Sequence, residues 1–185
     1  MTDFCRLIEN EIPRLRRYAR ALTRHGDRAD DLVQETLLRA IAKSHLWQTG
    51  TDIRAWLFTI MHNQYVNMVR RAMREEASVD IDQVSSSLVA TTDPTSSRQL
   101  RELERALARL PDEQREVILL VGLEGLSYES AAQILNVPVG TVRSRLSRGR
   151  DALRRLMDIP GRLMDIPERN HPASVRVTND VTVAA

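Results

Sequence analysis

The sequence is poor in the features that mark secreted and membrane proteins. Cys5 is the only cysteine among 185 residues, so no intramolecular disulfide can form, which fits a reducing compartment. No apolar run approaches the roughly 18–20 residues that cross a bilayer. The N-terminus is too polar for a signal peptide. We therefore expect a soluble, cytoplasmic protein.

Residue patterns typical of enzymes are also lacking. The four histidines are scattered, without metal-ligand spacing relative to Cys5. Neither a glycine-rich phosphate loop nor a nucleophile elbow is present. We therefore expect no metal, no cofactor and no catalytic activity. Lys43 is the only lysine among 27 basic residues, and the formal net charge is only +2. Any nucleic-acid binding must therefore come from how the charge is distributed.

The strongest pattern lies in residues 126–156, where we predict a helix-turn-helix. Ser127 suits the N-cap of a first helix ending near Leu135, because its hydroxyl can accept from a free backbone N–H. Asn136 tolerates the left-handed backbone of a helix end. Pro138 suits the first turn of the second helix, where its missing N–H costs nothing.

The second helix of this motif divides into an apolar stripe and a basic face. Residues 141–155 contain six arginines and a single acid, Asp151. Arginine can pair bidentately with guanine, while serine and threonine reach either base edge. A solvated basic face is the alternative, but the turn and the clustered arginines together favour DNA binding. The stripe comprises Val142, Leu146, Gly149, Leu153 and Leu156, and the polar face comprises Thr141, Arg143, Ser144, Ser147 and Arg148.

Two amphipathic helices are predicted at the N-terminal end. The first runs from about Phe4 to Leu22, although Pro13 either breaks it or starts it nearer Ile12. Gly26 is expected to stop it. The second spans residues 27–44, with a buried side comprising Leu32, Val33, Thr36, Leu37, Ala40 and Ile41. Its outer face holds Asp31, Gln34, Glu35, Leu38 and Arg39. Leu38 is an apolar residue among charged ones, so this face is either solvated or binds a protein.

A third helix is predicted from about Ile53 to Met73, after a loop that Thr51 or Asp52 caps. Its broad apolar face runs from Ile53 to Met73 and includes Trp56, which we expect in the core. Its polar face holds His62, Asn63, Asn67, Arg70 and Arg71. Amides and arginines suit bases and phosphates, whereas arginines near a helix C-terminus also compensate the helix dipole. Both interpretations stay open on the residues alone.

The composition changes after the third helix. Residues 76–97 contain four acids and no base, with serines, threonines and one proline, which predicts a flexible linker. It separates a domain at 1–75 from one at 98–157. The second domain has two helices, on either side of Pro111, before the helix-turn-helix. We therefore predict an all-α protein with two small helical domains, the second a four-helix helix-turn-helix domain. A near-tandem heptapeptide occupies residues 155–168, and residues 158–185 are expected to be disordered.

Four blocks together resemble the bacterial sigma factors of the sigma-70 family. They are ADDLVQETLLRA (29–40), DIRAWLFTIMHNQYVNMVRR (52–71), LPDEQREVILL (110–120) and the helix-turn-helix. The two-domain organisation resembles the extracytoplasmic-function (ECF) group. The match covers residues 8–156 in the family's order, so the tail lies outside it.

The resemblance implies a role for each polar face. Docking on core RNA polymerase is implied for Asp31, Gln34, Glu35, Leu38 and Arg39. Recognition and melting of the minus-ten element, by capture of an unpaired base, is implied for Trp47, Gln48, Thr49, His62, Asn63, Asn67, Arg70 and Arg71. Trp47 either stacks on a base or is packed. Recognition of the minus-thirty-five element is implied for Thr141, Arg143, Ser144, Arg145, Ser147 and Arg148.

The partners implied by the resemblance are core RNA polymerase, promoter DNA and an anti-sigma factor. The acidic linker would occupy the RNA exit path of the polymerase. Two other functions remain open at this point. One is a sigma-like decoy that sequesters an anti-sigma factor, and the other is a dimeric helix-turn-helix regulator. The polymerase-docking face favours the sigma factor over the decoy, and the regulator leaves the first domain unexplained.

Overall fold

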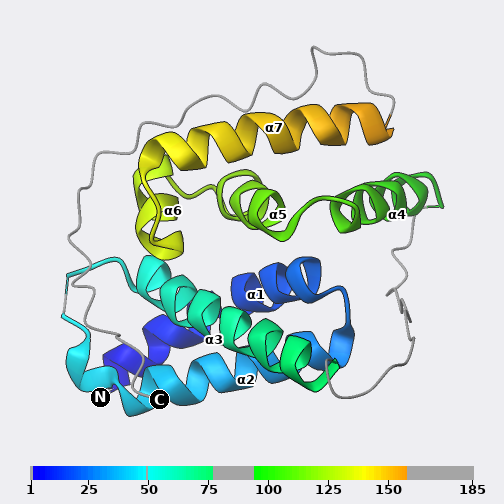
Figure 1. Cartoon of the computed structure of the whole chain (residues 1–185). Coiled ribbons are helices and arrows are strands. Elements are labelled where there is room, and N and C mark those ends of the chain that lie inside the picture. Colours follow the sequence, from blue (N-terminus) through cyan, green and yellow to red (C-terminus); the bar gives the residue numbers. More distant parts are fainter. Residues whose placement is uncertain (1, 49, 77–93, 158–185) are drawn as a thin grey trace.

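The computed structural model describes residues 2–48, 50–76 and 94–157, and this part of the chain consists of helices joined by short turns. Figure 1 shows two stacked groups of helices, with α1, α2 and α3 in one and α4, α5, α6 and α7 in the other. The fold class predicted from the sequence is therefore confirmed. The predicted tail and most of the predicted linker lie outside the described residues.

The first group is a three-helix unit. It comprises α1 (Thr2–Thr23), α2 (Gly26–Ala42), a short 3-10 turn η1 (Ser44–Leu46) and α3 (Ile53–Glu76). Asp52 caps α3, since its Oδ1 accepts from the backbone N–H groups of Arg54 at 2.9 Å and Ala55 at 3.2 Å. In the core, the rings of Tyr18 and Phe58 meet edge to face at a centroid distance of 5.0 Å. Trp56 is buried, as predicted.

Two expectations for α1 are wrong. Pro13 neither breaks nor starts the helix, which continues through it. Proline removes the N–H that would bond to the carbonyl of Glu9, and because Pro13 is exposed, water can reach that region. Gly26 is not the stop either, since it begins α2. Arg24 takes the left-handed backbone instead, with φ 63°.

The predicted buried stripes are wrong at three positions. Ile41, Met73 and Leu156 are all exposed. Each lies within the last four residues of its helix. Periodicity identifies a face, whereas burial also requires a neighbouring element alongside that turn.

The second group comprises α4 (Pro94–Ala108), α5 (Asp112–Ile118), a π-helical segment η2 (Leu119–Leu123), α6 (Tyr128–Leu135) and α7 (Val139–Met157). Arg115 ties the end of α4 to α5. Its guanidinium is buried and donates to the carbonyls of Leu107 at 2.9 Å and Leu110 at 2.7 Å. The Leu107 carbonyl also accepts from the Leu110 N–H at 3.1 Å, so Arg115 adds a second donor at this helix end, where backbone carbonyls run out of helical partners.

The helix-turn-helix forms as the sequence predicts. The Ser127 hydroxyl accepts from the Ser130 N–H at 3.0 Å, and Asn136 adopts the left-handed conformation with φ 51° and ψ 48°. Gly149 lets α7 approach α5, because a Cβ atom there would lie 2.6 Å from Ile118 Cδ1.

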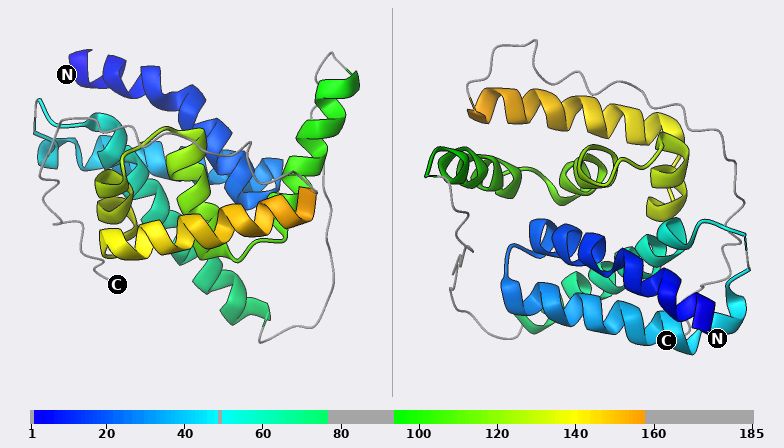
Figure 2. Two further views of the ribbon diagram at one scale, coloured as in Figure 1. Left: turned by 90° about the horizontal axis from the view of Figure 1, so that it is seen from above. Right: turned by 180° about the vertical axis from the view of Figure 1, so that it is seen from behind.

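The two groups of helices pack directly against each other. α6 lies on α3, and η2 lies on α1. Figure 2 shows from two further directions that the α4–α7 layer covers α1 and α3 on one side. Buried apolar residues of both domains form a single cluster. The chain therefore has two domains by sequence but one continuous core.

None of the described helices combines the length and apolarity of a membrane-crossing segment.

Candidate nucleic-acid interface

α7 presents a polar face to solvent because its opposite face is held in the core. Val142, Leu146 and Leu153 are buried and fix the rotation of the helix. Rotation by 100° per residue then directs the intervening side chains outward. The exposed members of the predicted minus-thirty-five set are Arg143, Ser147 and Arg148, while Thr141 and Ser144 are half-buried.

Short-range contacts order this face. The guanidinium of Arg143 lies over the ring of Tyr128 on α6, 5.8 Å from its centroid. Arg148 Nη2 donates to Ser144 Oγ at 3.4 Å, and Ser144 Oγ donates to the Thr141 carbonyl at 3.0 Å. Arginines held in this way lose less side-chain entropy when they bind a base or phosphate.

Arg145 differs from the rest of its predicted set. Its Nη2 lies 2.8 Å from Glu113 Oε2 on α5, and most of the side chain is covered. It therefore braces α7 against α5, while Arg143 and Arg148 remain exposed. The sequence pattern did not distinguish Arg145 from its neighbours, because its partner lies far away in the chain.

The predicted minus-ten set divides along α3. Arg70 and Arg71 are exposed near the end of the helix, whereas Asn63 and Asn67 are half-buried. His62 faces the second domain, with Nδ1 3.5 Å from Glu116 Oε2 and 15% of the side chain exposed. Of this predicted surface, His62 is thus covered by the chain's own second domain.

The loop before α3 is ordered by aromatic packing. Trp47 is half-buried, and its ring lies 5.3 Å from that of Phe4 on α1. Of the two options left open for Trp47, this structure has the packed one. Gln48 is exposed nearby, and Thr49 lies outside the described residues.

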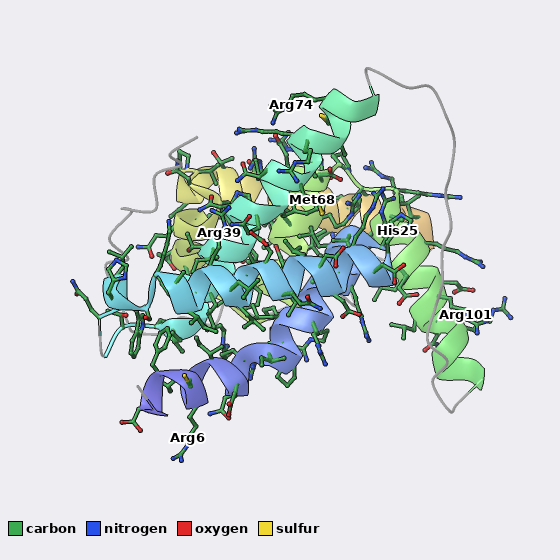
Figure 3. All side chains as sticks on the ribbon, turned by 90° about the horizontal axis from the view of Figure 1, so that it is seen from below. Arg6, His25, Arg39, Met68, Arg74 and Arg101 are labelled. Carbon is green, nitrogen blue, oxygen red and sulfur yellow. The ribbon has the colours of Figure 1, made fainter. Side chains whose placement is uncertain are left out.

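The predicted polymerase-docking face is on the opposite side of the molecule from α7 (Figure 1). Leu38 is 65% exposed. Glu35 and Arg39, one turn apart, form an ion pair at 3.4 Å. Figure 3, viewed from below, shows Arg39 on α2 at the surface that faces away from the second domain. Asp31 and Gln34 are exposed on the same helix. This face is therefore accessible while the domains are packed together.

Sequence reasoning missed a charged cluster between the domains, which we call the Glu124 cluster: Glu124, Arg14 and Arg17. The Glu124 side chain is fully buried and lies 2.9 Å from Arg17 Nη2 and 3.9 Å from Arg14 Nη1. Burial raises the pKa of Glu124, and the hydrogen bonds and charge of Arg17 oppose this without cancelling it. The one sequence signal is an acid inside the otherwise apolar segment VGLEGL.

Two packed helical domains, one ending in a helix-turn-helix with an exposed arginine face, define a class of helical DNA-binding protein. Comparison with known proteins agrees in both domains. Residues 8–62 match the family model described as the Sigma2 domain of PhyR, and residues 100–153 match Sigma-70, region 4. A relative from Rhodopseudomonas palustris, the ECF RNA polymerase sigma factor EcfG, is 42% identical over 146 residues, covering 79% of this chain and 80% of the relative. The chain therefore belongs to the ECF RNA polymerase sigma factors.

Solved structures show the same arrangement of helices. The sigma factor RpoE of Bartonella quintana, in complex with the anti-sigma factor NepR, has a TM-score of 0.78 at 36% identity. That match covers 86% of this chain and 99% of RpoE. CnrH, in complex with the cytosolic domain of CnrY, has a TM-score of 0.61 at 26% identity, covering 84% of this chain and 87% of that one.

Proposed function

We propose that this protein binds core RNA polymerase and directs it to promoters. The observation that carries the proposal is the exposed face of Arg143, Ser147 and Arg148 on α7, in a chain of the ECF sigma factor family. In this proposal α7 enters the major groove at the minus-thirty-five element. Arg143 and Arg148 are long enough to reach guanine O6 and N7, and Thr141, Ser144 and Ser147 contact base edges or phosphates.

The minus-ten element is assigned to α3 and the loop before it. Arg70 and Arg71 would contact backbone phosphates of the duplex, since both are exposed. His62, Asn63, Asn67, Gln48 and Thr49 would surround an unpaired base. Extracting a base from the stack costs a few kcal/mol, which contacts of this kind must offset. Trp47, packed on Phe4, would support the loop in its present rotamer.

Polymerase docking is assigned to the outer face of α2: Asp31, Gln34, Glu35, Leu38 and Arg39. An exposed leucine ringed by charged side chains has the composition of an interface centre with a polar rim. Neither DNA-binding surface is large by itself. Core polymerase would fix the distance between them, so that the second DNA contact forms as an effectively intramolecular step.

The role of Leu38 in polymerase docking can be tested against a matched control, an exposed leucine of the other domain. Leu38→Ala should weaken binding to core polymerase by about 1–2 kcal/mol, or roughly 5- to 30-fold, because an interface side chain is truncated. Leu100→Ala, at another exposed leucine on α4, should leave this affinity unchanged. Fluorescence titration of labelled protein with core polymerase gives both constants. Equal losses in the two variants would contradict docking on α2.

The function itself is tested by run-off transcription with core polymerase and a genomic promoter library. Promoter-specific transcripts above those of core polymerase alone are expected, and their start sites would give both promoter elements. Absence of initiation by a chain that still binds core polymerase would refute the proposal.

An anti-sigma factor is the proposed regulatory partner, supported by the likeness to RpoE in its complex with NepR. A decoy that sequesters such a factor is the second candidate function, since the first domain matches the model of PhyR's Sigma2 domain. The two differ in one property: a decoy has no need to initiate transcription. The same run-off assay therefore separates them.

A further inference from the structure

A buried carboxylate joins the two domains of this chain. Glu124 belongs to the second domain and is fully buried, yet its partners belong to the first. Arg17 of α1 holds it with three hydrogen bonds, from Nε to Oε1 at 3.1 Å and from Nη2 to both oxygens at 2.9 and 3.0 Å. A two-oxygen arginine–carboxylate pair of this kind is among the most directional polar contacts in proteins.

The local backbone presents Glu124 toward α1. η2 is π-helical and ends where the Glu124 N–H donates to the Leu119 carbonyl at 3.0 Å. Gly125 follows with φ 67°, a conformation that side-chain-bearing residues rarely adopt. The chain therefore turns sharply at the residue that carries the carboxylate. π-helical turns of this kind often occur at functional positions.

Further ion pairs within the first domain hold Arg14 in place beside Glu124. Arg14 Nε lies 3.6 Å from Glu11 Oε2, and Arg54 Nε of α3 lies 3.2 Å from the same oxygen. A second link lies just after the C-terminal end of α1, where Arg24 Nη1 donates to the Ala108 carbonyl at 3.2 Å. Two separate links therefore join the second domain to α1 and to the residue that follows it.

Closure of the domains covers α3. α6 packs on α3, and His62 lies against Glu116 with little of its side chain exposed. Gln64 is buried, and Asn63 is half-buried. A DNA strand cannot occupy this side of α3 while α6 is there. α2, by contrast, lies on the far side of the first domain from α4–α7 (Figure 1), and its docking residues are exposed.

We propose that the Glu124 cluster is an autoinhibitory contact that holds the second domain over α3 in the free protein. Opening, driven by polymerase or by DNA, exposes the side of α3 assigned above to the minus-ten element. For its effect on DNA binding by α3, this inference rests on the proposed function. The contact between the domains can be measured without DNA or polymerase.

The cluster predicts an asymmetry between its two partners. Arg17 is half exposed, so removing it leaves Glu124 as a buried charge with a weakened counterion, which is strongly unfavourable. Neutralising Glu124 instead removes the buried charge and leaves Arg17 free to reach solvent. Arg17→Ala should therefore open the domains strongly, whereas Glu124→Gln, whose side-chain oxygen can still accept from Arg17, should open them less. Adding Glu124→Gln to Arg17→Ala should restore much of the closure.

The test is a distance measurement between spin labels on exposed positions of the two domains. Arg28→Cys on α2 and Glu129→Cys on α6, in a Cys5→Ser background, report the separation in the full chain. The parent should give one narrow distance. Arg17→Ala should raise the ratio of open to closed molecules at least about tenfold, and Arg16→Ala, at a neighbouring exposed arginine, should not. Circular dichroism checks that the helices remain folded.

The possible outcomes distinguish the Glu124 cluster as a domain contact from its effect on DNA binding by α3. An unchanged distance in Arg17→Ala, or equal opening in Glu124→Gln, overturns the proposed cluster. If Arg17→Ala opens the domains, the free variant should also bind a single-stranded minus-ten oligonucleotide, taken from the run-off transcripts, more tightly by a similar factor. Opening without tighter binding overturns the masking of α3. Failure of run-off initiation refutes the proposed function instead and leaves the distance result standing.

Discussion

α3 and α7 are both long helices with arginines and small polar side chains, yet they are placed very differently. In α7, buried residues recur every three to four positions, and Arg143, Ser147 and Arg148 between them are open to solvent. In α3, every residue from Ala55 to Met61 is buried. α1 and α2 cover one side of α3, and α6 covers another. The comparison teaches that a polar face is available for binding only when no other element of the chain covers it.

The largest expected effect comes from truncating a leucine in each helix. Leu57→Ala in α3 and Leu146→Ala in α7 should each lower the free energy of unfolding by about 2–5 kcal/mol, because both leucines are buried. Since one apolar cluster spans both domains, calorimetry should show a single transition that both variants shift. Two transitions, each shifted by only one variant, would mean that the domains unfold independently.

The next effect tests the close packing behind α7. Gly149→Ala should cost about 1–3 kcal/mol, because its methyl group would collide with Ile118 and force a shift in the core. Gly140→Ala on the same helix is the control, since nothing lies within 4 Å of its position, and alanine there should be neutral or slightly stabilising. Urea denaturation measures both. Equal effects at the two glycines would contradict the close contact with α5.

A third prediction compares the exposed arginines of the two helices. Arg143→Ala should cost about 1–3 kcal/mol at one base of the minus-thirty-five element and relax specificity there. Arg71→Ala should weaken binding across sequences and lower the salt dependence by about one unit. Holoenzyme binding to promoter variants at several salt concentrations distinguishes them. If Arg143→Ala weakened all variants equally, it would contact phosphate instead of a base.

The smallest effect concerns pH. Burial raises the pKa of Tyr65 to about 12, with the charge of Asp112 adding to it. Burial, then the charge of Glu116, raises the pKa of Tyr18 well above its ordinary value of 10.0. Both phenols ionise at lower pH in the unfolded chain than in the folded one. The stability that they contribute is therefore complete below pH 10.0 and is lost as the pH rises toward 12.

Tyr18→Phe tests this directly, because the Tyr18 hydroxyl has no hydrogen-bond partner among the described residues. The variant should stay within about 1 kcal/mol of the parent at neutral pH and lose less stability between pH 10.0 and 12. Denaturant titrations at several pH values measure both quantities. An unchanged alkaline slope would assign the effect to other groups.

Capping residues and hydrophobic periodicity in the sequence predicted much of the second domain. Ser127 and Asn136 act within a few residues of themselves, so their capping roles follow from the chain alone. The same holds for the buried stripe of α7 as far as Leu153. The prediction for Pro13 is wrong because the cost of a proline within a helix depends on whether water reaches that turn, and Pro13 is exposed.

The helices, the helix-turn-helix and the arginine face of α7 can be predicted from the residues alone, because they depend on periodicity and on contacts between near neighbours. Three other contacts follow only from how the helices pack: Arg145 with Glu113, His62 with Glu116, and Glu124 with Arg17. These pairs join residues that are distant in the chain. Coulombic and hydrogen-bond partners of this kind are set by domain packing, which leaves no periodic trace in the sequence.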